Sequence, residues 1–212
     1  MNFDEDIFEE CCEMLAQRHY AVIDHFLTSQ EVSDLLVGLE NKYTQKKFKK
    51  AGVGQDEDLQ VDAQVRGDFI YWIDPEKDFE IKRRFVPCMN GFMDYVKKEF
   101  FLPIKDYEMH YSVYPEGTYY QRHLDQFKKD DSRVLTFICY LNFSWAAKYG
   151  GALRLYTKED DKERYVDILP EAGRFVCFRS DLLEHEVLPT QRVRYSLSGW
   201  MLNRKRSLKF LK

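Results

Sequence analysis

The 212-residue chain lacks the features that mark several classes of protein. No apolar run approaches the roughly 20 residues that a membrane-spanning helix needs, so we expect no membrane contact. Glycine and proline are scarce, with 10 and 6 residues, and 44% of the chain is hydrophobic, which excludes a disordered protein. The charges nearly cancel, since 32 Lys and Arg against 36 Asp and Glu give a net charge of −4. This balance argues against nucleic acid as the main partner.

The cysteines are few, odd in number and without CxxC spacing, at Cys11, Cys12, Cys88, Cys139 and Cys177. The first residues, MNFDEDIFEE, are acidic and lack the positive region followed by an apolar run that marks a secretory signal. We therefore expect free thiols in a reducing cytoplasm. We interpret Cys11 and Cys12 as packing positions of a helix, with a redox role as the alternative.

The two halves of the chain differ in their hydrophobic pattern, although the length predicts a single domain over 1–212. The first half, 1–105, predicts supporting helices and two strands. Its helices are expected over 4–18, from a cap at Thr28 or Ser29 onward, and over 79–101, and its strands over 20–27 and 65–73. The polar segment 44–62 predicts a long mobile loop.

From residue 106 to 203, short runs rich in β-branched and aromatic residues recur with turn residues between them. They predict eight strands, over 107–114, 118–125, 133–142, 151–157, 164–169, 174–179, 184–188 and 192–202. This spacing indicates an antiparallel double-sheet jelly roll. We therefore expect a mainly β fold in which the N-terminal helices pack against a jelly-roll core, followed by a basic tail at 204–212.

His123 and Asp125 are two residues apart in a predicted strand, so their side chains point to the same face. They could bind one metal ion, and His185, near the start of a later strand, is the best placed third ligand. Two histidines and one carboxylate leave coordination positions open on one side, which suits non-haem Fe(II) oxygenases. A chance His-x-Asp pair on the surface is the alternative. We interpret the other three histidines as packing or surface residues.

Arg194 lies nine residues after His185, in the run RVRYSLSGW. In an alternating strand it shares one face with the two serines of this run and with Trp200. An arginine inside a barrel is costly unless it meets an anion, and a dicarboxylate co-substrate would supply one. A structural salt bridge is the alternative. Tyr140 points inward from another predicted strand, so its hydroxyl could add a hydrogen bond to the same carboxylate.

Five runs carry a family signal: VRGDFIYWID, YPEGTYYQRHLD, RVLTFICYLN, GGALRLY and HEVLPTQRVRYSLSGW. Together they resemble the Fe(II)/2-oxoglutarate-dependent prolyl 4-hydroxylases. The branch they resemble is the Egl-nine type, which includes the hypoxia-inducible-factor prolyl hydroxylases and their bacterial relatives. The resemblance covers roughly residues 20–203 and implies a double-stranded β-helix, the jelly roll of this family.

The resemblance implies roles for the residues of the metal and co-substrate site. It implies His123, Asp125 and His185 as the iron ligands. It implies that Arg194, assisted by Tyr140, binds the distal carboxylate of 2-oxoglutarate. The positions that match the lining of the co-substrate pocket are Tyr114, Ile138 and Leu153. No residue beyond the metal centre is expected to take part in catalysis.

The resemblance also implies residues beside the bound peptide. Asp68 and Arg133 would pair with each other along the peptide channel, and an ordinary surface salt bridge is the alternative for them. Trp200 matches an aromatic residue at the mouth of the site. We interpret Trp72, in the strand that contains Asp68, as a core residue rather than a platform for substrate.

The activity that the resemblance implies is hydroxylation of a prolyl residue in a protein or peptide substrate, with release of succinate and CO₂. It implies Fe(II) as cofactor, 2-oxoglutarate and O₂ as co-substrates, and L-ascorbate as a supporting reductant. We also expect a cytoplasmic monomer. One alternative is the same chemistry on a small molecule or on another side chain. The others are a nucleic-acid demethylase and a non-catalytic metal-binding sensor module. The basic run KKFKK at 46–50 lies where a peptide would enter and favours an acidic target, with a solvated surface as the alternative.

Overall fold

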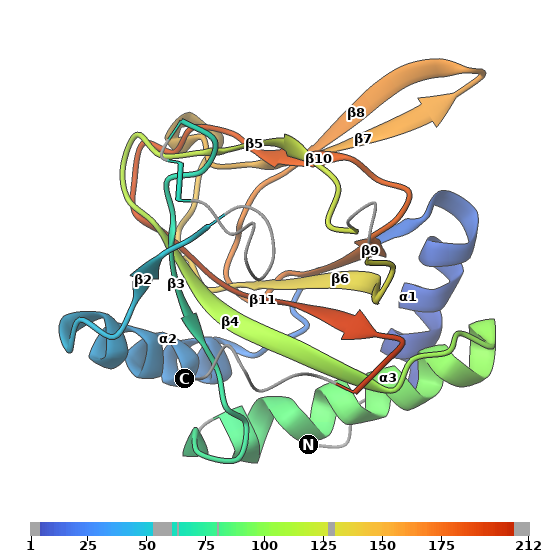
Figure 1. The fold of residues 1–212 in the computed structure, drawn as a ribbon, viewed down its shortest axis with the longest axis horizontal. Helices are drawn as coiled ribbons and strands as arrows, with labels where there is room; N and C mark the ends of the chain where they lie inside the picture. The colour runs from blue at the N-terminus through green and yellow to red at the C-terminus, as the bar shows by residue number, and fades with distance from the viewer. Residues whose placement is uncertain (1–4, 53–60, 63, 80, 127–129, 206–212) are drawn as a thin grey trace.

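Two antiparallel sheets face each other, and helices cover the outer side of the larger one (Figure 1). The computed structural model describes residues 5–52, 61–62, 64–79, 81–126 and 130–205. The larger sheet has the order β1 (Tyr20–Ile23), β9 (Phe175–Arg179), β6 (Arg133–Tyr140), β11 (Arg194–Leu202), β4 (Asp106–Tyr114), β3 (Phe69–Trp72) and β2 (Lys49–Lys50). The smaller sheet has the order β5 (Tyr120–His123), β10 (His185–Val187), β7 (Leu153–Glu159) and β8 (Lys162–Ile168).

Three α-helices support the larger sheet: α1 (Glu5–Arg18), α2 (Ser29–Thr44) and α3 (Val86–Phe100). The cap of α2 is Thr28, whose hydroxyl accepts a hydrogen bond from the backbone N–H of Glu31 (3.3 Å). In return the Glu31 carboxylate accepts one from the backbone N–H of Thr28 (2.9 Å), which completes a capping box. Pro87 lies in the first turn of α3, where its missing N–H costs no hydrogen bond, and the π-helical turn η2 (Ile81–Phe85) precedes it.

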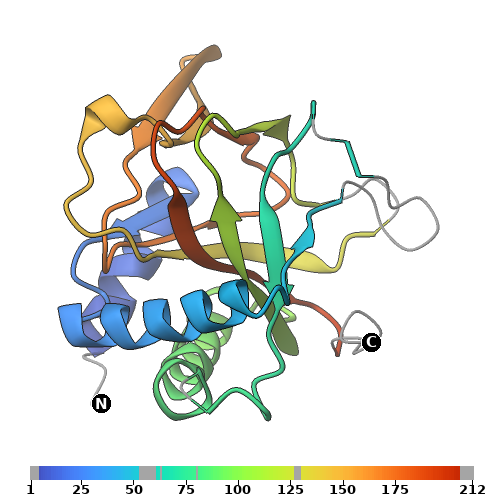
Figure 2. The ribbon, with the colours of Figure 1, turned by 90° about the vertical axis from the view of Figure 1, so that its left-hand side faces the viewer.

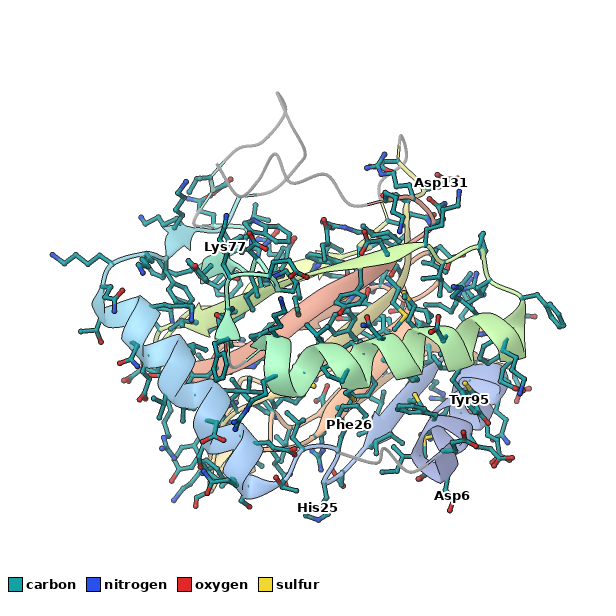
Figure 3. All side chains as sticks on the ribbon, turned by 90° about the horizontal axis from the view of Figure 1, so that it is seen from below. Asp6, His25, Phe26, Lys77, Tyr95 and Asp131 are labelled. Carbon is teal, nitrogen blue, oxygen red and sulfur yellow. The ribbon has the colours of Figure 1, made fainter. Side chains whose placement is uncertain are left out.

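The side chains of the larger sheet alternate between two environments. On β4 and β11, Met109, Tyr111, Val113, Leu197 and Met201 point away from the smaller sheet and belong to the main hydrophobic core. Figure 2 shows α2 and α3 beneath this face, and Figure 3 shows α3 crossing the underside of the sheet between α1 and α2. The residues between them along each strand face the smaller sheet, and this second face builds the site described below.

The jelly roll predicted from sequence, with helices packed against it, is confirmed, and each of the eight predicted C-terminal strands is present within a few residues of its expected position. The predicted loop 44–62 differs in one respect, because it contains the two-residue edge strand β2. Residues 53–60 of this loop lie outside the described residues, as does 206–212 of the basic tail, and the expected mobility of the loop stays a prediction. Among the described residues, no helix combines the length and apolar composition needed to cross a membrane.

Candidate metal centre and active site

A cavity of about 1430 Å³ opens between the two sheets and continues along the larger sheet toward its β2 edge. This is more than the roughly 300–1,000 Å³ of an ordinary small-molecule pocket, so it leaves room for a larger ligand. Its floor consists of alternate residues from three strands: Glu108, His110, Ser112 and Tyr114 of β4, Thr136 and Ile138 of β6, and Arg194, Ser196, Ser198 and Trp200 of β11. The inward phase predicted for the last of these strands is confirmed.

Three potential metal ligands meet in this cavity. His185 at the start of β10 is the direct cross-strand partner of His123 at the end of β5. Asp125 follows β5, and its carboxylate lies between the two imidazoles, 3.6 Å from Nε2 of His123 and 3.5 Å from Nε2 of His185. The three ligand atoms lie within 4.8 Å of one another. The structure therefore brings together the three residues singled out in the sequence, although Asp125 lies beyond the strand end rather than within it.

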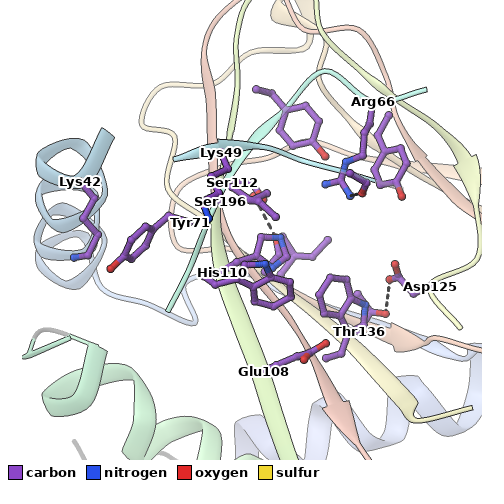
Figure 4. Close-up of a pocket in the computed structure, with 18 of the residues that line it drawn as sticks. Lys42, Lys49, Arg66, Tyr71, Glu108, His110, Ser112, Asp125, Thr136 and Ser196 are labelled. Atoms are coloured by element: carbon purple, nitrogen blue, oxygen red, sulfur yellow. Dashed lines mark hydrogen bonds between the residues drawn. The ribbon is translucent and has the colours of Figure 1, made fainter. Parts of the chain in front are cut away.

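Neighbouring groups orient these three side chains. Nδ1 of His123 lies 2.7 Å from the carbonyl oxygen of Gln121, and Nδ1 of His185 lies 3.2 Å from that of Leu183. When each Nδ1 donates to its carbonyl, each Nε2 is left free to bind a metal. The Thr136 hydroxyl donates to the Asp125 carboxylate (2.7 Å), as Figure 4 shows. The ligand set is thus held in place by hydrogen bonds from three different strands and loops.

Protonation states at the centre suit metal binding. Burial opposes ionisation of Asp125, but the neighbouring charges of His185, His123 and Arg133 hold its pKa well below the usual range. Burial and the charge of His123 lower the pKa of His185 to about 4. At neutral pH the site therefore offers an ionised carboxylate and a neutral imidazole at His185, the forms that bind metals. Two imidazoles and one carboxylate with an open side fit Fe(II).

Arg194 lies in the same cavity and is 1% exposed. Its Nε donates to the carbonyl oxygen of Gly151 (2.9 Å), and its guanidinium carbon lies 5.0 Å from the ring centre of Tyr114 and 4.9 Å from that of Tyr140. No carboxylate of the described residues pairs with it, and the buried Tyr140 hydroxyl has no hydrogen-bond partner there. A buried cation beside an unused hydroxyl fits an anionic group such as the distal carboxylate of 2-oxoglutarate.

The other residues that were predicted to line the co-substrate pocket lie in the walls of the cavity. Ile138 and Leu153 line the cavity and belong, with Tyr140, to a second hydrophobic cluster between the sheets. Tyr114 also lines the cavity and is buried, and this burial raises the pKa of its hydroxyl. These residues surround the same space as the Arg194 guanidinium.

The predicted pairing of Asp68 with Arg133 is wrong. Asp68 accepts two hydrogen bonds of 2.7 Å from Arg66, which is two residues away in an extended segment and therefore on the same side. Arg133 instead donates to Glu108 (3.3 Å), and its guanidinium lies 3.5 Å from the ring centre of Trp200. Arg66 and Arg133 both line the cavity, whereas Asp68 is 1% exposed and does not.

The interpretation of Trp72 as a core residue is also wrong. Trp72 is half-buried in the cavity wall because its cross-strand partner, His110, faces the cavity. The His110 ring lies 5.0 Å from that of Trp72 and 5.3 Å from that of Trp200, which extends the stack that begins at Arg133. Burial, followed by the charges of two arginines, lowers the pKa of His110 to about 3.

Sequence reasoning missed His110 as a residue of the site. Its Nδ1 and the Nε1 of Trp200 are buried and have no hydrogen-bond partner among the described residues. The signal was available, because His110 is four residues before Tyr114 and so shares its face of a predicted strand. His110 is not part of the ligand cluster, but it belongs to the wall next to it.

Comparison with known proteins agrees with this geometry. A family model described as the 2OG-Fe(II) oxygenase superfamily matches residues 109–202. The hypoxia-inducible factor prolyl hydroxylase of Caenorhabditis elegans is 30% identical over 208 residues, which cover 93% of this chain and 28% of that protein. Egl nine homolog 1 of Homo sapiens is 32% identical over 193 residues, which cover 84% of this chain and 42% of that protein. The chain thus spans less than half of the length of these two relatives.

Two solved structures match over nearly their whole length. A Pseudomonas putida prolyl-4-hydroxylase has a TM-score of 0.82 and 32% identity, and the match covers 93% of this chain and 100% of that one. A Trichoplax adhaerens prolyl hydroxylase, in complex with a hypoxia inducible factor oxygen degradation domain peptide fragment, has a TM-score of 0.84 and 27% identity, with 94% and 90% covered. The chain belongs to the prolyl hydroxylase family of the 2OG-Fe(II) oxygenase superfamily.

Proposed function

We propose that the protein is a Fe(II)- and 2-oxoglutarate-dependent dioxygenase that hydroxylates a prolyl residue in a protein or peptide substrate. One observation carries this proposal: an open His-Asp-His cluster and a buried arginine that pairs with no carboxylate of the described residues face the same cavity. A module that only holds a metal has no use for Arg194. The relative that was solved with a peptide fragment supports a peptide substrate.

Different residues of the chain bind the metal and the co-substrate. His123, Asp125 and His185 hold Fe(II), and the Thr136 hydroxyl fixes the carboxylate among them. Arg194 and the Tyr140 hydroxyl bind the distal carboxylate of 2-oxoglutarate against apolar walls that keep water away from the reacting atoms. When bound together there, iron, 2-oxoglutarate and O₂ supply the oxidative chemistry, and succinate and CO₂ are released.

We assign contact with the peptide to the stack at the cavity wall. Trp200 presents an aromatic surface, and Arg133 is held over that surface by its ion pair with Glu108 (3.3 Å). Asp68 acts indirectly, because it is buried behind Arg66 and orients that guanidinium toward the cavity. The protein's contribution to rate is to hold the target C–H bond near the metal in one orientation.

Further parts of the proposal concern the protein as a whole. We place the activity in one catalytic domain over 1–212, supported by the core that α1, α2 and α3 share with the larger sheet. We place it in the cytoplasm, where the five buried free thiols would stay reduced. L-ascorbate as a supporting reductant and a monomeric state complete the proposal. Succinate yield with and without ascorbate tests the first, and sedimentation analysis tests the second.

The deciding experiment measures two products of the reaction, succinate and the oxidised peptide. The protein is loaded with Fe(II) and 2-oxoglutarate, and proline-containing peptides are compared with matched peptides in which alanine replaces the proline. We expect succinate and a peptide mass increase of one oxygen only with proline. Succinate without oxidised peptide would point to another substrate class. Absence of both succinate and the visible charge-transfer band of the anaerobic iron chelate would show a binding module.

A further inference from the structure

The cavity wall is strongly positive although the chain as a whole carries a net charge of −4. Ten Lys and Arg side chains line it, against four Asp and Glu. The cations are Lys42, Lys47, Lys49, Lys50, Arg66, Lys77, Arg133, Arg194, Arg204 and Lys205. A cleft lined by one sign of charge concentrates the field and attracts ligands of the opposite sign.

Five of these cations, namely Arg194, Lys205 and three lysines at or next to β2, form no ion pair with a carboxylate of the described residues. Several of the others form ion pairs, which join Lys42 to Asp78, Arg66 to Asp68, Lys77 to Asp74, Arg133 to Glu108 and Arg204 to Asp130. Lys47, Lys49 and Lys50, here called the lysine strip, are exposed, and none pairs with a carboxylate in the part of the chain that the structure describes. The strip lies at β2, the edge of the larger sheet.

The register of the sheet connects the lysine strip to the reaction site. Lys49 is the cross-strand partner of Ile70, Ile70 of Ser112, Ser112 of Ser196, and Ser196 of Tyr140. Partners across an antiparallel pair lie on the same face, so the Lys49 side chain belongs to the cavity side of the sheet. Figure 4 shows Lys49, Ser112 and Ser196 along this row.

The spacing of the strands gives the number of substrate residues between the metal centre and the lysine strip. The metal ligand Asp125 is hydrogen-bonded to Thr136 on β6, four residues along that strand from Tyr140, and β2 is four strands away from β6 in the sheet order. Four strand spacings of ~4.8 Å give ~19 Å across the sheet, and four residues at ~3.3 Å give ~13 Å along it, so the diagonal is ~23 Å, which an extended chain covers with about seven residues. A substrate whose proline lies at the metal therefore reaches the lysine strip about seven residues away.

We propose that the natural substrate segment is acidic, and that its carboxylates, about seven residues from the target proline, bind the lysine strip. This inference rests on the proposed function, because that function places the proline at the metal centre. A protein segment is favoured over a nucleic acid, which would also supply anions, because a related hydroxylase was solved with a peptide fragment and this chain is acidic overall.

Fluorescent peptides with one proline test the inference by binding alone. Three versions carry a Gln triplet, a Glu triplet before the proline, or a Glu triplet after it, each centred about seven residues from the proline. Anisotropy is measured with the full chain, loaded anaerobically with Fe(II) and 2-oxoglutarate. We expect one Glu peptide to bind about tenfold tighter than the Gln peptide in ~50 mM salt, and the preference to shrink in ~500 mM salt because exposed pairs are screened.

Two variants locate the effect. Replacing all three residues of the lysine strip with Gln should abolish the preference for the Glu peptide. The matched control, Lys98→Gln with Lys148→Gln and Lys158→Gln, removes three exposed lysines that do not line the cavity and should keep it. 2-Oxoglutarate consumption without peptide should be the same in both variants, since neither touches the metal or co-substrate residues.

The possible failures are distinguishable. Equal affinity of all three peptides, or an equal loss in the control variant, would overturn the inference. So would a single-stranded oligonucleotide that binds more tightly than the Glu peptide and displaces it. If the Glu peptide binds through the lysine strip but its proline is not oxidised, the inference stands and the proposed prolyl activity fails. If the Gln peptide is oxidised as efficiently as the Glu peptides, the activity stands and the inference fails.

Discussion

Arg194→Met should convert a pocket that selects dicarboxylates into one that does not. Methionine keeps most of the side-chain volume but removes the charge. The native guanidinium uses Nε on the Gly151 carbonyl (2.9 Å), which leaves its two terminal nitrogens for a bidentate contact with a carboxylate. Because Arg194 is buried and pairs with no carboxylate in the part of the chain that the structure describes, the substitution should cost the free protein little stability.

The magnitude follows from the two lost hydrogen bonds. Each bond to a charged group contributes about 1.5–3 kcal/mol, so the pair contributes about 3–6 kcal/mol. At about 1.4 kcal/mol per tenfold change, 2-oxoglutarate should bind at least ~100-fold more weakly to the variant. A keto acid without the distal carboxylate, 2-oxobutyrate, makes neither bond. Its affinity should therefore hardly change.

The measurement is calorimetric titration of both keto acids into protein loaded with a redox-inert divalent metal. The native chain should prefer 2-oxoglutarate by at least ~100-fold, and the variant should bind the two acids about equally. Arg192→Met, which removes an exposed arginine two residues earlier in the chain, is the control and should keep the preference. A variant at Arg194 that still discriminates between the acids would refute the assigned role of this residue.

Three further predictions concern the site and its support. Thr136→Val leaves the Asp125 carboxylate without its 2.7 Å donor, so metal affinity should fall by about 10–100-fold in a competition titration, and unchanged affinity would contradict the assigned role. Burial lowers the pKa of His110 to about 3, so the unfolded chain binds more protons between pH 6.5 and 3 and stability falls as the pH drops through that range. Between pH 7 and 4.5, the free energy of unfolding of His110→Leu should therefore fall by about 2–3 kcal/mol less than that of the native chain in urea titrations. Equal losses in the two proteins would contradict the lowered pKa of His110. Gly199→Ala would place Cβ 2.2 Å from the backbone oxygen of Glu108, so the melting temperature should fall by several degrees, and an unchanged value would show that the backbone yields.

Much of the fold follows from short-range patterns. The start of α2 depends on Thr28 and Glu31, three residues apart, and the capping box forms wherever those residues can adopt a helical start. The inward phase of Arg194 and Trp200 follows from the two-residue period of a strand, which holds before any partner strand is known. Such features are encoded within one element, so the sequence alone predicts them.

The two wrong predictions concern which neighbouring side chain a residue contacts, because the sequence does not distinguish among the possible partners. Asp68 was expected to pair with Arg133, but Arg66, only two residues away along the chain, donates to it at 2.7 Å. Trp72 could face either the helices or the cavity, and its pairing with His110 settles the matter. Both outcomes depend on which strand lies next to which and in what register, a property of residues that are distant along the chain.

The order of residues along the chain is enough to specify the available chemistry: the ligand types, their spacing, and an arginine that strand alternation directs inward. The folded sheets are needed to pair His123 with His185 across two strands and to bring their ligand atoms within 4.8 Å of each other and of Asp125. They also give an acidic chain a positive cavity, because the sheet order brings β2 and its lysines to the end of a row that leads to the metal site. Hydrogen-bond register between distant strands is the physical reason, since it sets which side chains share one face.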